Sequence, residues 1–407
     1  MRHELTIDRL GTQGDGIAET GDGPAFVPFT LPGERVVADV EKGRGTLIDL
    51  LLRSPERVEP ICRHFGICGG CAVQHLDRSA YLEWKRQRVV DALRMEGIDT
   101  EVEPVRAFGP HTRRRAAFAA IKAPGGLVFG YRRAQSHDIV ALAECPVLLP
   151  RIEAALPALR NLVDMLLPAG EARITVTACD NGIDVDIEKL LGKLRPFTSG
   201  HGIAAEAAGI IRLTAAGDPF FSIAAPRVNL AGVDVELPPG AFLQASSEAE
   251  TAMAEIAMEA LGKARKVADL FCGLGTFSFA MARRASVTAV ENNRALLLAL
   301  GGAVRRARGI KPITLLARDL MREPLAAPEL KFDAVLFDPP RAGALAQAAA
   351  LARSRVPKVM AMSCNPASFA RDARTLLDGG YELSRVVPID QFVFSAHIEL
   401  VAVFARN

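Results

Sequence analysis

The stretch FDAVLFDPPRAGALAQAAALARSRVPKVMAMSCNP, residues 332–366, decides the fold of this chain. Two apolar runs of strand length, 334–337 and 359–362, flank an Ala/Leu/Arg segment of helix length. The pattern predicts a β-α-β unit with two parallel, buried strands. Open α/β sheets bind ligands beyond the carboxyl ends of their strands. The residues that follow the two runs should therefore meet at the rim of one crevice, namely Asp338, Pro339, Pro340 and Cys364.

Cys364 is a candidate nucleophile because of its place at this rim. The alternative is a small, inert core residue, since free cysteines are usually buried. Glu399 also allows a structural and a functional interpretation. It lies near the start of a last apolar run, 397–404, which is predicted to be a final strand. A carboxylate is costly to bury without a partner, so Glu399 is either a residue at a strand edge or a working acid or base. Perturbed carboxylates gather in clefts, which favours the second interpretation.

Regular β/α alternation extends from residue 266 to the C-terminus. A strand, 267–271, leads into a turn in which Gly273 and Gly275 let a ligand approach the backbone, just before a helix begins near Thr276. The third glycine of a dinucleotide-binding turn is missing, so the turn favours a nucleoside over a pyrophosphate.

Two carboxylates follow the next strands of this region. The strand 286–290 ends in Glu291, where such folds place a carboxylate on ribose hydroxyls. Asp319 follows the strand 313–317 and is either an adenine contact or a carboxylate at a helix N-terminus. Upstream of these strands, residues 247–261 have a helical pattern with Ser246 or Ser247 as the N-cap.

The whole chain has 407 residues and a formal net charge of +2. The length suggests two or three domains, and the small charge restricts any nucleic-acid contact to a local patch. No apolar run reaches the roughly 18 residues of a membrane span, and the start lacks the apolar stretch of a signal peptide. We therefore expect a cytoplasmic protein with no membrane partner.

Residues 1–55 alternate short β-type runs with glycine-rich turns. Five short strands in so few residues suggest a small β-barrel of OB type, a common oligonucleotide binder. However, residues 1–59 hold seven Lys or Arg against eleven Asp or Glu, so a purely structural cap is the alternative.

Four cysteines form a motif suited to metal, a close group followed by a distant fourth member: Cys62, Cys68, Cys71 and Cys145. Thiolate ligands select zinc or iron and sulfur, and the spacing alone leaves both open. His64 and His75 are nearby nitrogen donors, although we expect them to be ordinary, partly exposed histidines. The thiols indicate a reducing compartment.

Two arginine runs near the cysteines are interleaved with aromatic residues. The first precedes Phe118 and the second surrounds Tyr131; their members are Arg113, Arg114, Arg115, Arg132 and Arg133. Arginines and aromatics in this arrangement can hold phosphates and stack bases, which predicts RNA contact, with a solvated polar face as the alternative.

Taken together, these motifs resemble the class I S-adenosylmethionine-dependent RNA 5-methyluridine methyltransferases over nearly the whole chain. The resemblance implies an α/β fold in which residues 241–407 form a class I, Rossmann-like methyltransferase domain. Residues 1–58 resemble the OB-like β-barrel called a TRAM domain, with PGERV at 32–36. Residues 59–240 would form a mixed α+β central domain carrying the cysteines and the RNA-binding elements.

The same resemblance implies roles for particular residues. Cys364 in SCNP matches the nucleophile loop, Glu399 in HIE the general base, and Arg341 belongs to the DPPRAG motif, where we expect RNA contact. Gln244, Phe271, Glu291 and Asp338 match cofactor-contacting positions, which join Gly273, Gly275, Thr276 and Asp319 as the predicted S-adenosylmethionine site. Leu243, Ser246 and Thr276 depart from the residues common in the family.

The four cysteines match the ligands of the 4Fe-4S cluster in the ribosomal-RNA branch of the family, which favours iron and sulfur over zinc. The expected partner is RNA, with 23S rRNA preferred and tRNA as the alternative, and the expected state is a monomer. A small-molecule methyltransferase would not need the barrel, cysteines and arginines, and a noncatalytic RNA-binding module would not need Cys364 and Glu399.

Overall fold

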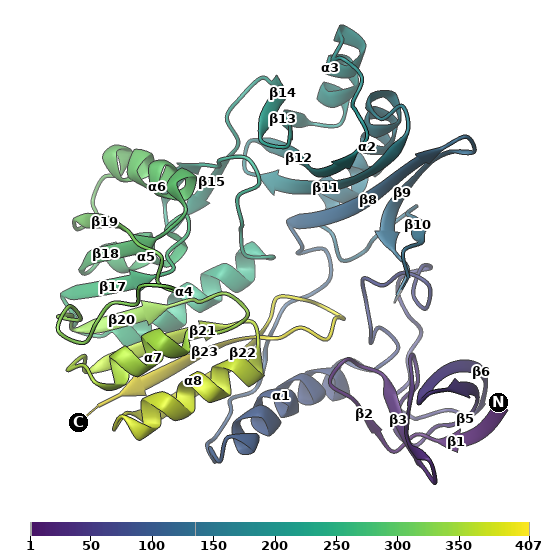
Figure 1. Cartoon of the computed structure of the whole chain (residues 1–407), viewed down its shortest axis with the longest axis horizontal. Helices are drawn as coiled ribbons and strands as arrows, with labels where there is room; N and C mark the ends of the chain where they lie inside the picture. Colours follow the sequence, from purple (N-terminus) through teal and green to yellow (C-terminus); the bar gives the residue numbers. More distant parts are fainter. Residues whose placement is uncertain (1, 135, 407) are drawn as a thin grey trace.

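The computed structural model describes residues 2–134 and 136–406. Figure 1 shows three sheets as separate lobes: a curled N-terminal sheet, a central sheet, and a C-terminal sheet with helices on both faces. No helix among the described residues is long and apolar enough to cross a membrane.

The N-terminal sheet confirms the predicted OB-like barrel, with six strands where five were expected. Its order is β1-β5-β6-β4-β3-β2, and the strands are β1 (Arg2–Thr6), β2 (Arg9–Leu10), β3 (Gly16–Thr20), β4 (Gly23–Val27), β5 (Arg35–Glu41) and β6 (Arg44–Leu52). Alternate residues such as Leu5, Val27 and Val36 point inward and form its small core. Gly16 is required there, because a Cβ on it would lie 2.1 Å from Oγ1 of Thr30.

The central sheet has seven strands in the order β10-β9-β8-β11-β12-β13-β14. They are β8 (Arg115–Ala123), β9 (Gly126–Arg132), β10 (Ile139–Ala141), β11 (Gly170–Cys179), β12 (Gly182–Leu191), β13 (Ile210–Ala215) and β14 (Asp218–Ser222). The apolar stripe of α2 (Pro150–Leu166) packs on this sheet, and α3 (Ser199–Ala207) packs against α2.

The C-terminal sheet has eight strands in the order β19-β18-β17-β20-β21-β23-β22-β7. They are β7 (Arg106–Ala107), β17 (Lys266–Leu270), β18 (Ser286–Glu291), β19 (Ile313–Ala317), β20 (Ala334–Phe337), β21 (Lys358–Ser363), β22 (Glu382–Asp390) and β23 (Glu399–Ala405). β20 and β21 pair in parallel, as their apolar runs predict, and β23 inserts antiparallel between β21 and β22.

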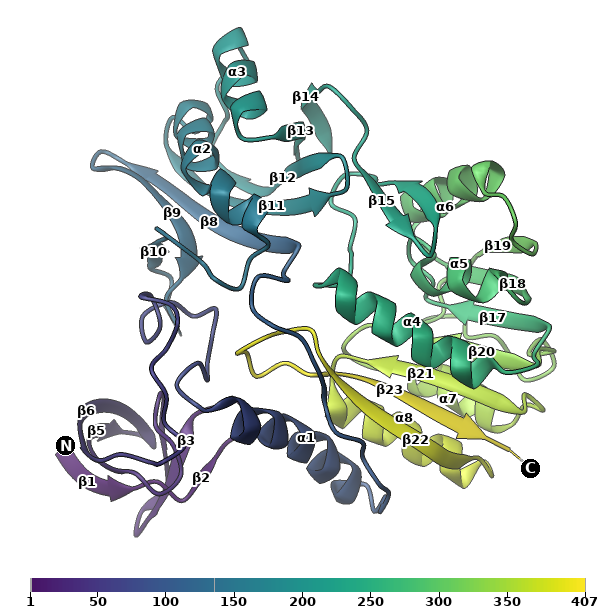
Figure 2. The same cartoon turned by 180° about the vertical axis from the view of Figure 1, so that it is seen from behind.

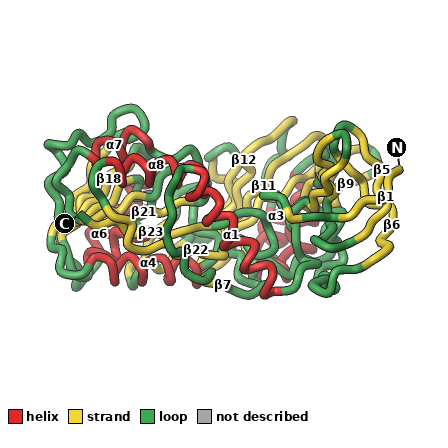
Figure 3. The backbone as a smooth tube through the Cα atoms, turned by 90° about the horizontal axis from the view of Figure 1, so that it is seen from below, coloured by secondary structure: helices red, strands yellow, loops and turns green. Residues whose placement is uncertain are grey.

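Helices cover both faces of this sheet, which explains why its central strands are apolar throughout. One face carries α4 (Ser247–Leu261), α5 (Thr276–Ala282) and α6 (Arg294–Arg306). The other carries α1 (Arg78–Met95), α7 (Leu345–Ala352) and α8 (Pro366–Asp378). Figure 3 shows α4 and α6 on the opposite side of the sheet from α7 and α8. Ser246 caps α4 by accepting a hydrogen bond from the backbone N–H of Ala249.

Two segments that the sequence places in the central domain pack instead on the C-terminal sheet. Helix α1 lies against α8, as Figure 2 shows, and β7 pairs with β22 at the sheet edge. The hairpin of β15 (Arg227–Leu230) and β16 (Val233–Glu236) packs on α5 and α6. Val89 and Leu93 of α1 are buried in the core on one face of that sheet, and Val228 and Val235 of the hairpin in the core on the other face. The predicted domain boundaries at residues 58 and 240 therefore divide the sequence, but some segments between them pack on the C-terminal sheet.

Candidate active site

A cavity of about 490 Å³ opens at the carboxyl ends of β17, β18, β20 and β21. This volume lies in the range of small-molecule sites. Of the residues predicted to bind cofactor or act in catalysis, all but Gly275 line it: Gln244, Phe271, Gly273, Thr276, Glu291, Asp319, Asp338, Cys364 and Glu399. Arg341, predicted as an RNA contact, lines it too. The β17–β20 junction, where the strand order reverses, is where such sheets bind ligands.

The glycine turn gives its two glycines different tasks. Gly273 has φ 54° and open space around the position of a Cβ, so its backbone remains accessible from the cavity. Gly275 has φ 88°, and a Cβ on it would lie 2.6 Å from Cδ1 of Leu300. Gly275 therefore shapes the turn and the packing beneath it and does not line the cavity. Phe271, just before the turn, also has a positive φ, 62°, a strained conformation that proteins retain mostly at functional sites.

The two predicted ribose and adenine contacts have backbone partners. Glu291 accepts hydrogen bonds from the N–H of Gly273 at 3.1 Å and from those of Asn292 and Asn293 at 2.9 Å each. Asp319 accepts from the N–H of Met321 at 3.0 Å and of Arg322 at 3.3 Å. Asp319 thus caps a turn and not the helix of the alternative interpretation, since none of the described residues between it and β20 lies in a helix, and it lines the cavity as well.

A chain of side chains joins the half-buried carboxyl of Asp338 to the buried carboxyl of Glu399. Gln244 donates to Asp338 at 3.4 Å, and Gln391 donates both to Gln244 at 2.9 Å and to Glu399 at 2.8 Å. Glu399, at the first position of β23, is 4% exposed, so it is not an exposed residue at a strand edge. Gln391 was not predicted from the sequence, where no motif marks it.

Burial changes the protonation of all three titratable groups at the centre of the cavity. It raises the pKa of Asp338 to about 7. It also raises the pKa of Glu399 well above its ordinary value, as does the charge of Asp338, while the hydrogen bond from Gln391 opposes the rise. Burial and the two carboxylates raise the pKa of the Cys364 thiol to about 11, against the influence of Arg341. Such perturbed groups in one cleft are typical of acid–base chemistry.

The predicted RNA-binding arginines do not share one environment. Arg114 is only 6% exposed; it pairs with Glu250 at 2.6 Å and donates to the carbonyl of Gln244 at 2.9 Å. The expectation that Arg114 contacts RNA is therefore not met, because its guanidinium is occupied in joining the central region to α4. Arg113 lies over the ring of Phe392 and Arg115 over that of Phe242. Both are half-buried.

The second arginine run lies at the end of β9 and beyond it. Arg132 pairs with Glu171 and donates to the carbonyl of His137, and Arg133 is exposed. Arg132 is the last residue of β9, the strand that carries Tyr131, and Arg133 follows it.

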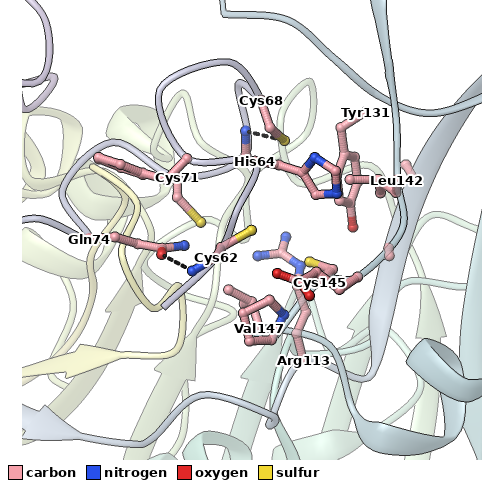
Figure 4. Close-up of a pocket in the computed structure, with 16 residues that line it drawn as sticks. Cys62, His64, Cys68, Cys71, Gln74, Arg113, Tyr131, Leu142, Cys145 and Val147 are labelled. Atoms are coloured by element: carbon pink, nitrogen blue, oxygen red, sulfur yellow. Dashed lines mark hydrogen bonds between the residues drawn. The ribbon is translucent and has the colours of Figure 1, made fainter. Parts of the chain in front are cut away.

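The four predicted metal ligands line one cavity of about 200 Å³, together with residues of the loop between β6 and α1, of β8 and β9, and of the segment 142–147. Figure 4 shows the sulfur atoms of Cys62, Cys68, Cys71 and Cys145 around the same space, with Arg113 beside them. Burial raises the pKa of Cys71 to about 11 and that of Cys145 to about 12, so these thiols release their protons only to a strong competitor such as a metal. Across the described residues, no three His, Cys, Asp or Glu side chains converge closely enough for a single metal ion.

The two nearby histidines differ from each other. His64 lines the cysteine cavity and accepts a hydrogen bond from the N–H of Ala143 at 3.1 Å. His75 is fully buried beside Phe65 and Phe29, so the expectation of a partly exposed side chain is wrong. Its burial lowers its pKa to about 4 and keeps the ring neutral.

Comparisons with known proteins agree with this geometry. The family model described as tRNA (Uracil-5-)-methyltransferase matches residues 318–407, and the TRAM domain model matches residues 2–46. An uncharacterized RNA methyltransferase of Brucella suis is 48% identical over 409 residues, which cover 99% of this chain and 98% of that protein. The 23S rRNA (uracil(1939)-C(5))-methyltransferase of Vibrio vulnificus is 34% identical over 433 residues, covering 99% and 96%.

A solved structure has a similar fold along its whole length. The tRNA (uracil-54, C5)-methyltransferase of Pyrococcus abyssi, in complex with S-adenosyl-L-homocysteine, superposes with a TM-score of 0.78. The match covers 99% of each chain at 24% sequence identity, so it bears on the fold.

Proposed function

This chain belongs to the S-adenosylmethionine-dependent RNA uracil-C5 methyltransferase family, and from that membership we propose that it methylates C5 of one uridine in 23S rRNA through a covalent adduct with Cys364. The observation that carries the proposal is that Cys364 and Glu399, far apart in sequence, line one cavity with the glycine turn of β17. A methyltransferase acting at a nucleophilic heteroatom would need no such pair. We propose that the protein acts as a monomer in the cytoplasm.

The chemistry needs both residues because C5 of uracil is a poor nucleophile. Addition of the Cys364 thiolate to C6 makes C5 nucleophilic enough to take a methyl group. Glu399 then removes the proton from C5, the C6–S bond breaks, the C5–C6 double bond re-forms, and the thiolate leaves. Arg341, whose charge favours the thiolate, lies beside Cys364. The uridine must leave its stack to reach this depth, so a flipped or looped base is required.

S-adenosylmethionine would supply the methyl group as a sulfonium electrophile. We propose that Gln244, Phe271, Gly273, Thr276, Glu291, Asp319 and Asp338 hold it, with Gly275 shaping the turn. The fit rests on the size of the cavity, on the open backbone at Gly273, and on the carboxylate of Glu291 at the end of β18.

We also propose a 4Fe-4S cluster on Cys62, Cys68, Cys71 and Cys145. Four half-buried cysteines that surround a cavity suit a cube of iron and sulfur. Zinc is the alternative, since the same four thiols could ligate one ion. The cluster would be structural, since its cavity is separate from the one that holds Cys364.

RNA would contact the positive groups that remain accessible near the two cavities. We propose Arg113, Arg115, Arg132, Arg133 and Arg341 for this role, together with the N-terminal TRAM domain. The alternative substrate is tRNA, which the matching family model and the archaeal structure name for their own members.

The test uses full-length protein prepared without oxygen, methyl-labelled S-adenosylmethionine, and two unmodified transcripts, 23S rRNA and tRNA. We expect 5-methyluridine at one position of the 23S transcript, with no label in RNA from a Cys364→Ala reaction. Label confined to the tRNA would move the substrate to the alternative class. Label at a position other than uracil C5 would refute the proposed chemistry.

A further inference from the structure

Gln391 connects the predicted base, Glu399, to Gln244, a predicted cofactor contact. It is the first residue after β22, is 2% exposed, and donates hydrogen bonds to both Gln244 and Glu399. Resting on the function proposed above, we propose that Gln391 is the positioning residue of the base: it holds the Glu399 carboxylate ionised and in place to take the C5 proton.

The orientation of the Gln391 amide is determined by its third partner. Its Oε1 accepts a hydrogen bond from the backbone N–H of Ala245 at 2.9 Å. An N–H can only donate, so the oxygen must face Ala245 and the NH₂ group must face the cavity. The two hydrogens of that NH₂ group are then both used, one on Gln244 and one on Glu399.

The hydrogen bond to Glu399 matters because its surroundings disfavour a charge. The titratable groups that face Glu399 are Asp338, at the end of β20, and Cys364, at the end of β21; Arg341 acts on Cys364. Asp338 repels a negative charge on Glu399, and burial penalises it. Among the described residues, Gln391 is the side-chain hydrogen-bond donor to that carboxylate, and this bond is the influence that lowers its pKa.

The same amide orders the cofactor side of the cavity. Because Gln391 donates to Oε1 of Gln244, the Nε2 group of Gln244 must turn toward Asp338, at 3.4 Å. Gln391 therefore sets the direction of donation along the whole path from Glu399 to Asp338.

The position of Gln391 is fixed from outside the sheet by α1. The preceding residue, Asp390, is fully buried and accepts hydrogen bonds from Lys85 and, at 2.7 Å, from the hydroxyl of Tyr81. Lys85 also donates to the carbonyls of Phe392 at 3.0 Å and His397 at 2.7 Å. A buried lysine with three oxygen partners on both sides of Gln391 holds the segment between β22 and β23 in one conformation.

The segment after Cys71 holds the far end of the same loop. The N–H groups of Ala72 and Val73 both donate to the carbonyl of Phe394, at 2.8 and 3.1 Å, and the N–H of Phe394 donates to the Tyr81 hydroxyl. The loop that leads into Glu399 is thus attached along its length, which a positioning role for Gln391 requires.

The decisive variant is Gln391→Met, which keeps the length of the side chain and removes its hydrogen bonds. Gln347→Met is the matched control, because Gln347 is also fully buried and bonds to the backbone of Leu325, away from the cavity. The assay measures kcat from pH 5 to 9 on the unmodified 23S transcript, and the amount of denaturant-resistant protein–RNA adduct at each pH.

For Gln391→Met we expect the acid limb of the kcat–pH profile to move to higher pH by about one unit. At a given pH on that limb, kcat should fall about tenfold. Loss of one hydrogen bond to a carboxylate implies a change of this size. Methylated adduct should accumulate at low pH, because elimination is the step that slows. Gln347→Met should lower the melting temperature and leave the acid limb in place. A structural role alone for Gln391 would give that second pattern.

A second variant, Gln391→Glu, tests the inference if Gln391→Met does not fold. Gln391→Glu retains the size and polarity and places a second carboxyl against Glu399, so the acid limb should move further upward. An unchanged acid limb in the folded variants would overturn the inference while the wild-type enzyme still methylates RNA. A wild-type enzyme that leaves every uridine unmodified would instead refute the proposed function.

Discussion

At the scale of single residues, Cys364 and Glu399 have tasks at opposite ends of one intermediate. Without the thiol no adduct forms, so Cys364→Ala should bind RNA and S-adenosylmethionine yet transfer no methyl group. Without the base the adduct forms and is methylated, but the C5 proton stays and elimination stalls. Glu399→Gln should therefore accumulate a denaturant-resistant protein–RNA band that carries the methyl label. Normal turnover by Glu399→Gln would remove it from the mechanism.

Glu291 allows a test of the cofactor site that is independent of RNA. Glu291→Ala should weaken S-adenosylmethionine binding by about 1 to 3 kcal/mol, the cost of leaving buried hydrogen-bonding groups unpaired. Isothermal titration calorimetry measures the change. Glu259→Ala is the control, because Glu259 pairs with Arg385 near the surface and neither residue lines the cavity. Equal affinity of the Glu291 variant and the control would exclude Glu291 from the site.

At the scale of elements, neighbouring arginines that enter β8 should respond differently to substitution. Arg114→Met leaves Glu250 buried without its partner, and breaking such a pair costs about 3 to 5 kcal/mol of unfolding free energy. Cofactor affinity should fall as well, because Arg114 supports the backbone of Gln244. Arg113→Met should mainly lower RNA affinity and make its salt dependence shallower by about one phosphate contact. Urea denaturation and filter binding at several salt concentrations separate the two effects; equal stability of the two variants would contradict this assignment.

The turn between β4 and β5 should make stability depend on pH. Glu34 is fully buried and accepts hydrogen bonds from Arg57 at 2.6 and 2.8 Å, and from the N–H groups of Leu31 and Ser54. Burial opposes ionisation, but these donors hold the pKa of Glu34 below its ordinary value.

The folded pKa of Glu34 lies below the unfolded value of about 4.3, so the stabilisation is complete above that value and disappears as the pH falls through the folded pKa. Glu34→Gln should thus be less stable than wild type at pH 7, with the difference shrinking between pH 5 and 3. Urea titrations across that range measure it, and a difference that does not change with pH would contradict the role of the Glu34 charge.

The sequence predicted the strands of the C-terminal sheet well, because a polar residue ends each apolar run. Asp338, Glu291 and Cys364 are examples, and their meeting in one cavity followed from parallel pairing. The sequence did not predict that Arg114 is buried while Arg113 is only half-buried, because a run of like charges does not show which side chain points into the protein. Gln391 gave no signal either, because its role depends on Ala245, which is distant in sequence. The packing of α1 against α8 could not be predicted either, because the apolar stripe of a helix does not show which element it packs against.

At the scale of the whole molecule, the cysteine cavity joins the N-terminal and central regions. Protein purified without oxygen should contain iron and acid-labile sulfide, and Cys145→Ser should lose both and melt at a lower temperature, because metal binding contributes to folding. Cys179→Ala is the control, since Cys179 is a buried cysteine outside that cavity and should keep its iron. Zinc without iron in the wild-type protein would refute the cluster.

The insertion of β23 between β21 and β22 has a consequence for biosynthesis. The C-terminal sheet cannot close until Glu399–Ala405, which follows the other strands of this sheet in the sequence, has been made and has taken its interior place. Helix α1, made some three hundred residues earlier, must wait with its apolar side uncovered until α8 and β22 arrive. Because the proposed base is the first residue of β23, the proposed catalytic pair is complete only after β23 has taken its place between β21 and β22.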